Sequence, residues 1–251
     1  MRYTFLLFLV IACSTPNTEK QVDYYAHIED EKARNIIQAA ITKAGGIATW
    51  KNKKSLKYSK QFALLLEDGS IQKSYNQIHA YRYNPLNIDI VSVENGDTLH
   101  TVLEDGNYQR RKNDSLLDVS QAKLAKSVNS STFVLGMPFK LLDAGAQISY
   151  LGETTFMNKT AEIIVVHYNA DQHKNHSSSE SWKFYFDKEN ANWLGYWVAS
   201  SDHYNTVENL SFEQIGDLSL IKERKSYRAD SLGNPLYLRA DYTYGAYEIS
   251  Y

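Results

Sequence analysis

The chain has 251 residues, of which 43% are hydrophobic and 22% are charged, with a formal net charge of -2 and a pI near 6.4. This length is enough for one large domain or two small ones, and no Pro/Gly-rich hinge divides the part that follows Tyr24. We expect no nucleic-acid partner, because phosphate binding requires a clear basic excess. The single cysteine, Cys13, excludes a disulfide within the chain.

Residues 1–12 have the organisation of a lipoprotein signal peptide. Arg2 gives the positive start, residues 5–11 form an apolar run, and Ala12 is the small residue beside the cleavage site. The run is too short to span a bilayer, which takes about twenty apolar residues. It ends in Val-Ile-Ala-Cys, which resembles a lipobox. The resemblance implies that the Cys13 thiol is diacylated, so we expect a membrane partner through the lipidated Cys13.

Residues 13–23 are predicted to form a flexible tether. The stretch after Cys13 is polar and lacks any apolar period, as is typical of a linker. Ser14 follows the cysteine in place of an aspartate, and by analogy with the sorting rule of many double-membraned bacteria this favours the outer membrane. We therefore expect a lipid-anchored protein of the cell envelope.

An amphipathic helix is predicted where the folded part begins. Its apolar stripe consists of Ala33, Ile36, Ile37, Ala40, Ile41 and Ala44. Gly45-Gly46 ends it, and Trp50 is expected to fold back on the same core. Four lysines then cluster at Lys51, Lys53, Lys54 and Lys57. A solvated face is the favoured interpretation of this cluster, and an anionic membrane surface is the alternative.

After residue 56 the spacing of apolar residues changes from the helical repeat to the alternation that is typical of strands. Turn signals such as Asp68-Gly69, Asn95-Gly96-Asp97 and Asp105-Gly106 recur about every eight to twelve residues, which is typical of antiparallel β-structure. Roughly a dozen strands are too many for a flat sheet. We predict a mainly β fold: residues 24–251 form a single domain with a strongly curved antiparallel sheet, a half-barrel, and an N-terminal helix.

Residues 116–142 interrupt the strands and are predicted to be a helical insertion over the concave face. Two strands, 62–66 and 163–166, are apolar on both faces, which requires apolar layers above and below them. A ligand groove is the sharper hypothesis and ordinary core packing is the alternative. The candidate groove residues are Phe62, Leu64, Leu66, Phe133, Leu135, Met137 and Phe139.

The order of these features suggests a family. The chain resembles uncharacterised lipoproteins of Bacteroidota in the order of its features. These are the helix ending at Lys43-Ala44-Gly45-Gly46, Trp50, an antiparallel meander, the helical insertion, the segment Trp182-Lys183-Phe184-Tyr185-Phe186-Asp187 and a last hairpin over residues 227–244. Those proteins are in turn similar to lipoprotein-carrier half-barrels of the Lol type. The resemblance implies that an apolar concavity holds an acyl chain, a lipophilic small molecule or a lipoprotein. The periplasmic carrier of that type is not acylated, so the likeness points to the anchored, receiving partner.

Catalytic and metal motifs are sparse. No Gly-x-Ser-x-Gly elbow, phosphate-binding glycine loop or His-Glu-x-x-His helix occurs. His173 and His176 have a spacing seen at metal sites, with Asp171 and Glu180 nearby, but they lie in a polar loop and solvated side chains are the favoured interpretation. We therefore expect no catalytic residue, no metal, no cofactor and no enzymatic activity.

Tyrosine is abundant, at 19 residues. Tyr75, Tyr81, Tyr83, Tyr242, Tyr244 and Tyr247 are expected at outward positions of strands, where β-propensity explains most of them. Rings with a polar tip also suit stacking on carbohydrate. The alternative function is therefore a cell-envelope interaction protein that binds a protein or glycan partner through tyrosine-rich strands.

Overall fold

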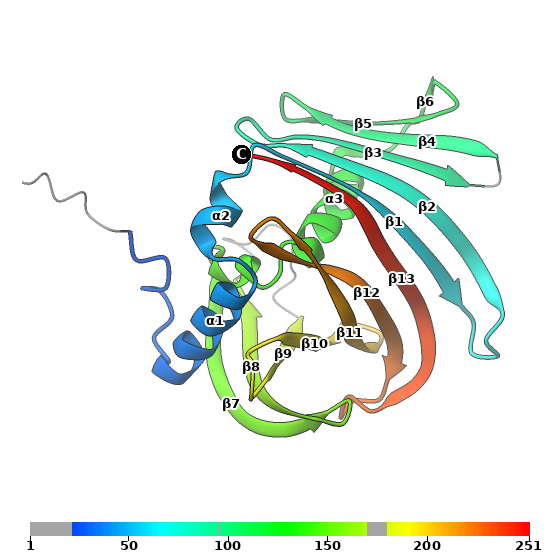
Figure 1. Ribbon diagram of the computed structural model, residues 1–251. Helices are drawn as coiled ribbons and strands as arrows, with labels where there is room; N and C mark the ends of the chain where they lie inside the picture. Colours follow the sequence, from blue (N-terminus) through cyan, green and yellow to red (C-terminus); the bar gives the residue numbers. More distant parts are fainter. Residues whose placement is uncertain (1–21, 95, 170–179) are drawn as a thin grey trace, which may run out of the picture.

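The computed structural model describes residues 22–94, 96–169 and 180–251, and all thirteen of its strands belong to one antiparallel sheet (Figure 1). The first meander contains β1 (Ser55–Leu65), β2 (Ile71–Arg82), β3 (Asn87–Glu94), β4 (Asp97–Glu104), β5 (Asn107–Lys112) and β6 (Ser115–Leu116). The second contains β7 (Ala146–Phe156), β8 (Lys159–Tyr168), β9 (Ser181–Asp187), β10 (Trp193–Ala199), β11 (Tyr204–Ile215), β12 (Leu218–Ala229) and β13 (Pro235–Ser250). The predicted mainly β fold is confirmed.

The two meanders join in the middle of the sheet, where β1 pairs with β13. The strand order is β6-β5-β4-β3-β2-β1-β13-β12-β11-β10-β9-β8-β7, so β6 and β7 are the edges and, among the described residues, they do not pair with each other. The sheet curves around its concave face without closing, as Figure 1 shows. The result is the half-barrel that the sequence predicted, with a β2–β6 wing and a β7–β10 wing.

Bulges help the long strands to bend. Register shifts occur in the pairs β1–β13, β7–β8, β9–β10, β11–β12 and β12–β13, and a bulge increases local twist and bends the strand. At Gly195 in β10 the backbone has φ 153°, and a Cβ atom there would lie 1.9 Å from the carbonyl oxygen of Val207 in β11. Only glycine fits at this close approach.

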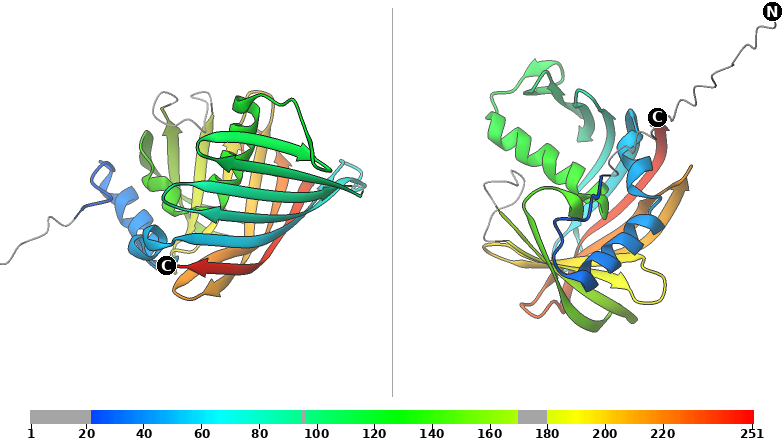
Figure 2. Two further views of the ribbon diagram at one scale, coloured as in Figure 1. Left: turned by 90° about the horizontal axis from the view of Figure 1, so that it is seen from above. Right: turned by 90° about the vertical axis from the view of Figure 1, so that its left-hand side faces the viewer.

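Helix α1 (Glu31–Lys43) lies across one end of the half-barrel (Figure 2). It buries Ala33, Ile37, Ala40 and Ile41, as the periodicity predicted. One carboxylate oxygen of Asp30 caps the helix by accepting from the Ala33 N–H at 3.0 Å, and the other accepts from the Tyr150 N–H of β7 at 2.8 Å. Asp30 therefore connects the start of α1 to the edge of the sheet.

A short second helix, α2 (Ile47–Asn52), follows and was not predicted. It places the Trp50 ring against Phe139 of the 3-10 helix η1 (Phe139–Leu142), with 4.6 Å between ring centres and nearly parallel planes. Trp50 therefore folds back on the core as expected.

Helix α3 (Gln121–Leu135) occupies the concave side between the two wings (Figure 2). At one end the Gln121 side chain accepts from the Tyr108 N–H at 2.8 Å and donates to the Tyr108 carbonyl at 2.6 Å, which joins the helix to β5. Near the other end Phe133 packs edge-on against Tyr168 and Trp182 of the opposite wing. The predicted helical insertion over the concave face is confirmed.

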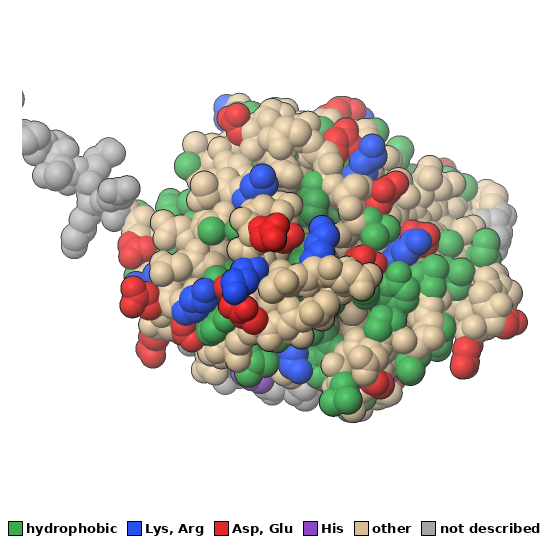
Figure 3. Space-filling view, turned by 60° about the horizontal axis from the view of Figure 1, so that its bottom comes forward, with side chains coloured by type: hydrophobic (Ala, Val, Ile, Leu, Met, Phe, Trp, Pro, Cys, Tyr) green, Lys and Arg blue, Asp and Glu red, His purple; other side chains and the backbone are tan. Residues whose placement is uncertain are grey.

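The main core lies on the concave side, between the sheet and the helices. A smaller apolar cluster around Phe156, Tyr185 and Trp197 covers the outer face of β7–β10. Ile164 of β8 belongs to the main core and Ile163 to the outer cluster, so this strand is apolar on both faces as predicted. Figure 3 views the outer face from below and shows acidic and basic side chains interspersed with apolar ones.

The double contact of Asp30 predicts a measurable loss of stability on truncation. Asp30→Ala removes a helix cap and leaves the Tyr150 N–H without its partner, so we expect the free energy of unfolding to fall by about 1–2 kcal/mol, measured by urea denaturation. Glu29→Ala, at an exposed neighbouring position, is the control and should cost less than about 0.5 kcal/mol. Equal effects of the two changes would contradict the assignment.

Candidate ligand-binding site

A cavity of about 210 Å³ lies beneath α3 on the concave face of the first meander. Alternate residues of the strands point into it, because only every second side chain faces the concave side. The helix contributes one face. The lining residues are Phe62, Tyr75, Gln77, His79, Ile90, Ser92, Glu94, Leu99, Thr101, Arg110, Ser127, Val128 and Ser131. The cavity is therefore amphipathic and more polar than the apolar concavity that the sequence predicted.

The predicted groove residues are spread over three places. Phe62 lines the cavity, Leu64 is half-buried further along β1, and Leu66 is exposed just past the end of that strand. The four residues of the insertion are buried in the main core: Phe133, Leu135, Met137 and Phe139. Of these, Leu135 also lines a separate cleft nearer to α2. The structure thus brings one of the seven to the cavity wall.

An uncharged histidine stands in the cavity wall. His79 is fully buried, its Nε2 donates to the Gln77 side-chain oxygen at 3.1 Å, and its Nδ1 accepts from the Tyr81 hydroxyl at 3.0 Å. Burial, together with the positive charge of Lys60, lowers the pKa of His79 to about 3. The imidazole is therefore neutral at physiological pH and contributes hydrogen bonds without charge.

Two cations, the half-buried Lys60 and the buried Arg224, lie beside the cavity and flank β13. Lys60 of β1 is paired in register with Tyr244, and Arg224 of β12 with Tyr242. The Tyr242 ring centre is 5.5 Å from the Lys60 ammonium and 4.5 Å from the Arg224 guanidinium. Burial, with Arg224 nearby, lowers the pKa of Lys60 to about 7. Aromatic rings therefore take the place of carboxylates as the neighbours of these charges.

Arg224 is the more unusual of the two cations. Its side chain is 5% exposed, and its Nε and Nη1 atoms have no hydrogen-bond partner among the described residues. Burying an unpaired charge is unfavourable. The sequence did not indicate this feature, because alternation along β12 identifies the side of the strand that carries Arg224 but not the depth of its burial.

Six tyrosines were predicted to point outward, but in the structure they face the interior. Tyr81, Tyr244 and Tyr247 are buried, and the remaining three, Tyr75, Tyr83 and Tyr242, are partly buried. The prediction is wrong because strand alternation distinguishes two faces without identifying the concave one. Tyrosine suits this interior since its hydroxyl can reach a partner, as when Tyr247 donates to the Ile221 carbonyl at 2.6 Å.

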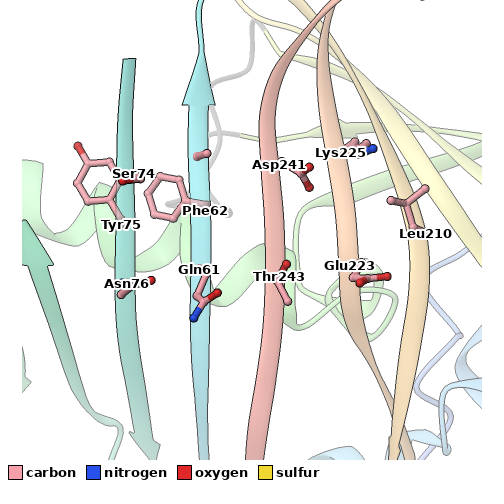
Figure 4. A pocket seen from close by; sticks show the side chains of 11 residues that line it. Gln61, Phe62, Ser74, Tyr75, Asn76, Leu210, Glu223, Lys225, Asp241 and Thr243 are labelled. Atoms are coloured by element: carbon pink, nitrogen blue, oxygen red, sulfur yellow. The ribbon is translucent and has the colours of Figure 1, made fainter. Parts of the chain in front are cut away.

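The outer face carries a wide, open depression of about 610 Å³ over β1, β2, β11, β12 and β13 (Figure 4). Its side chains are mainly polar and carry both signs of charge, with Asp241 of β13 beside Lys225 and Glu223 two residues from Lys225 along β12. The Glu223 carboxylate accepts from the Ser211 hydroxyl at 2.8 Å. This surface is open to solvent, whereas the concave cavity is covered by α3, so the cavity is the better candidate site.

Cys13 and the pair His173 and His176 lie outside the described residues, so the lipidation and metal-site hypotheses stay predictions. Within the described ranges, no group of three or more His, Cys, Asp or Glu residues could hold a metal ion. No helix in the same ranges is long and apolar enough to cross a membrane.

Sequence comparison gives no relatives: no family model matches the chain, and no curated protein matches it. Solved structures do match. A DUF1329 family protein from Desulfovibrio piger aligns over 86% of this chain and 92% of its own, with a TM-score of 0.52 and 9% identity. A putative outer membrane lipoprotein-sorting protein domain from Vibrio parahaemolyticus aligns over 88% and 93%, also with a TM-score of 0.52 and 9% identity.

This protein shares its fold with both. A LolA superfamily protein from Nitrosomonas europaea also aligns, over 87% of this chain and 94% of its own, with a TM-score of 0.46 and 8% identity. The half-barrel fold expected from the order of sequence features is confirmed by the sheet topology and by the two structures with a TM-score of 0.52. The Bacteroidota family to which the sequence was likened stays a prediction.

Because two guanidinium nitrogens of Arg224 have no hydrogen-bond partner among the described residues, we predict that Arg224 does not stabilise the unliganded fold. For Arg224→Met we expect a free energy of unfolding that is unchanged or higher by up to about 2 kcal/mol, because a well-packed apolar side chain replaces a buried charge. Urea denaturation measures it, with the exposed Arg82→Met on β2 as control. A loss greater than about 2 kcal/mol would show that the guanidinium is a structural anchor.

Proposed function

We propose that this protein is a lipid-anchored, non-enzymatic protein of the cell envelope that binds a lipophilic ligand or acyl chain on the concave face of its half-barrel. Residues 24–251 form the binding domain, behind a signal peptide at 1–12 and a tether at 13–23. The observation that carries the proposal is the partly covered cavity between α3 and strands β1–β5. The sheet supplies a rigid wall and the helix a cover.

The size of the cavity requires the cover to move. Ligand pockets usually measure about 300–1,000 Å³, whereas this cavity measures about 210 Å³. The middle of α3 contains Ser127, Asn129, Ser130, Ser131 and Thr132, residues with modest helix propensity. The side chain of its N-cap residue makes no capping bond. In the proposal, α3 is therefore a weakly stabilised helix that moves away from the sheet to admit a ligand.

The structural neighbours support an envelope role. The Vibrio parahaemolyticus protein is described as a putative outer membrane lipoprotein-sorting protein domain, and the lipobox-like end of residues 1–13 suggests the same compartment for this chain. We infer that Cys13 holds the protein on the outer membrane and that its ligand is an acyl chain, another lipophilic molecule or the lipidated end of a lipoprotein.

The alternative function, a partner or glycan bound by tyrosine-rich strands, needs exposed rings. Tyr81, Tyr244 and Tyr247 are buried in the core, and Tyr83 and Tyr242 pack against it. Of the six, Tyr75 alone lines the outer depression, and it also lines the concave cavity. These rings therefore offer little surface to a partner docking on the outer face, which favours the lipophilic-ligand proposal.

Filling the cavity predicts a loss of ligand binding. In Ser131→Trp an indole enters the space beneath α3, and we expect the affinity for a dansyl-labelled fatty acid to fall by at least about tenfold, or about 1.4 kcal/mol, in a fluorescence titration. Ser130→Trp is the matched control, because Ser130 is exposed on the same helix and does not line the cavity. The proposal fails if the fatty acid binds wild type and Ser131→Trp alike, or binds neither.

The anchor predicts acylation of Cys13. In cells that carry the lipoprotein pathway, wild type should incorporate labelled palmitate and remain with the membranes, because two or three acyl chains bind a bilayer almost permanently. Cys13→Ala should incorporate none, whereas Ser14→Ala should be labelled normally. Absence of label from the wild-type protein would refute the anchor without bearing on the cavity.

A further inference from the structure

A second opening lies further along α3, toward α2 and η1. This cleft measures about 390 Å³, within the usual range for ligand pockets. One part of its wall is apolar and aromatic, formed by Trp50, Tyr83 and Leu86 among others. Trp50 is held in place by its stacking on Phe139. The cleft and the cavity described above both involve α3 and β2 but have no lining residue in common, so the cleft can be tested separately.

Lys53, at which α2 ends, is buried in this cleft. The lysine cluster at 51–57 was interpreted as a solvated face, and for Lys53 that interpretation is wrong, since the residue is 6% exposed. Its ammonium donates to the Trp50 carbonyl at 2.7 Å and lies 3.5 Å from the Trp50 ring centre and 4.2 Å from that of Tyr83. The aromatic rings enclose the charge and draw the side chain inward.

The ammonium of Lys53 can donate more hydrogen bonds than it makes within the described residues. An ammonium has three N–H groups, and its one hydrogen bond within the described residues is to the Trp50 carbonyl. No salt bridge joins Lys53 to a carboxylate in that part of the chain. Burial and the nearby charge of Lys140 lower the pKa of Lys53 to about 7. An unpaired buried cation is costly, and a bound anion would remove that cost.

The remaining polar groups of the cleft suit an oxyanion. Lys140 is a second cation in the wall and is paired with Asp143 at 2.9 Å. Asn84 and Asn129 offer amide donors, and no carboxylate lines the cleft. The wall therefore presents donors and positive charge at one side and aromatic surface at the other.

We propose that this cleft binds an amphiphilic oxyanion, a phosphate or carboxylate carried on an apolar body. The oxyanion contacts Lys53 and Lys140, and the apolar body packs against Trp50, Tyr83 and Leu86. A lipid headgroup and a free phosphate share the head chemistry, but only the lipid supplies the apolar body. The proposal does not depend on a ligand in the concave cavity.

Trp50 fluorescence tests the proposal with three probes: decyl phosphate, inorganic phosphate and decanol. We expect decyl phosphate to bind at least about tenfold more tightly than either of the others, a difference of about 1.4 kcal/mol. Trp50→Phe should abolish the signal and so assign it to this cleft. Equal binding of decanol would overturn the role of the anion, and equal binding of inorganic phosphate would overturn the role of the apolar body.

Lysine variants test which positive charge is needed to bind decyl phosphate. Lys53→Met should weaken decyl phosphate binding by at least about tenfold and melt no lower than wild type, because it removes an unpaired charge. The exposed neighbour Lys54→Met is the matched control and should bind normally. Unchanged binding by Lys53→Met would overturn the proposal. Ser131→Trp should leave this binding intact, so failure of the cleft and failure of the cavity are distinguishable.

The pH dependence gives an independent readout. Lys53, whose pKa is lowered to about 7, must take up a proton to bind an anion at alkaline pH. Affinity should therefore fall as the pH rises from about 7.5 to about 9, and the fall should be absent in Lys53→Met. A wild-type affinity that is flat over this range would contradict the role of Lys53.

Discussion

The structure depends on how the concave face of an open sheet is covered. A sheet of thirteen strands that curves without closing exposes its inner face, and the apolar part of that face must be buried. Helix α1 covers one end, and α3 spans the interior between Gln121, bonded to β5, and Phe133, packed on the opposite wing. A single straight helix cannot pack closely against both wings of the sheet along its whole length. The cavity and the cleft are the spaces left along it.

The interior that results is unusual in its charge. Lys53, Lys60 and Arg224 are held among aromatic rings, and none forms a salt bridge within the described residues. Packing alone would favour apolar residues at these positions. Departures from local rules concentrate at functional sites, and the amphiphilic oxyanion proposed for the cleft would give one of these cations, Lys53, an anionic partner. The apolar groove expected from the sequence contains no such cation.

Much of the architecture could be predicted because its signals are local. Asp68-Gly69 and Gly106 mark hairpins through their turn chemistry, and the stripe of α1 follows from helical spacing. Strand lengths could not be predicted. β1 begins at Ser55, because Ser55 pairs with Ser250 of β13 at the far end of the chain, and no local pattern contains that contact. The cover of the concave face was inferred from two strands that are apolar on both faces and from the helical insertion between the strand groups, yet the polar contacts of this cover required coordinates.

The site residues were harder to predict, because they too depend on contacts between residues that are far apart in the sequence. Phe62 was identified from an apolar run, whereas His79 and Arg224 belong to the interior because the sheet curves around them. Lys53 is buried because the Trp50 and Tyr83 rings enclose it. Charge and polarity in a sequence usually indicate solvent exposure. That rule fails where aromatic side chains from distant strands enclose a cation, and nothing in the neighbouring residues signals the failure.

Native mass spectrometry of the protein extracted from membranes of the cells that make it tests the central claim most directly. The account predicts a species heavier than the acylated chain by the mass of a lipophilic molecule, which is lost on unfolding and is absent from Ser131→Trp. A wild-type protein that carries only its own acyl chains, under conditions in which a known lipid-binding protein keeps its ligand, would contradict the account.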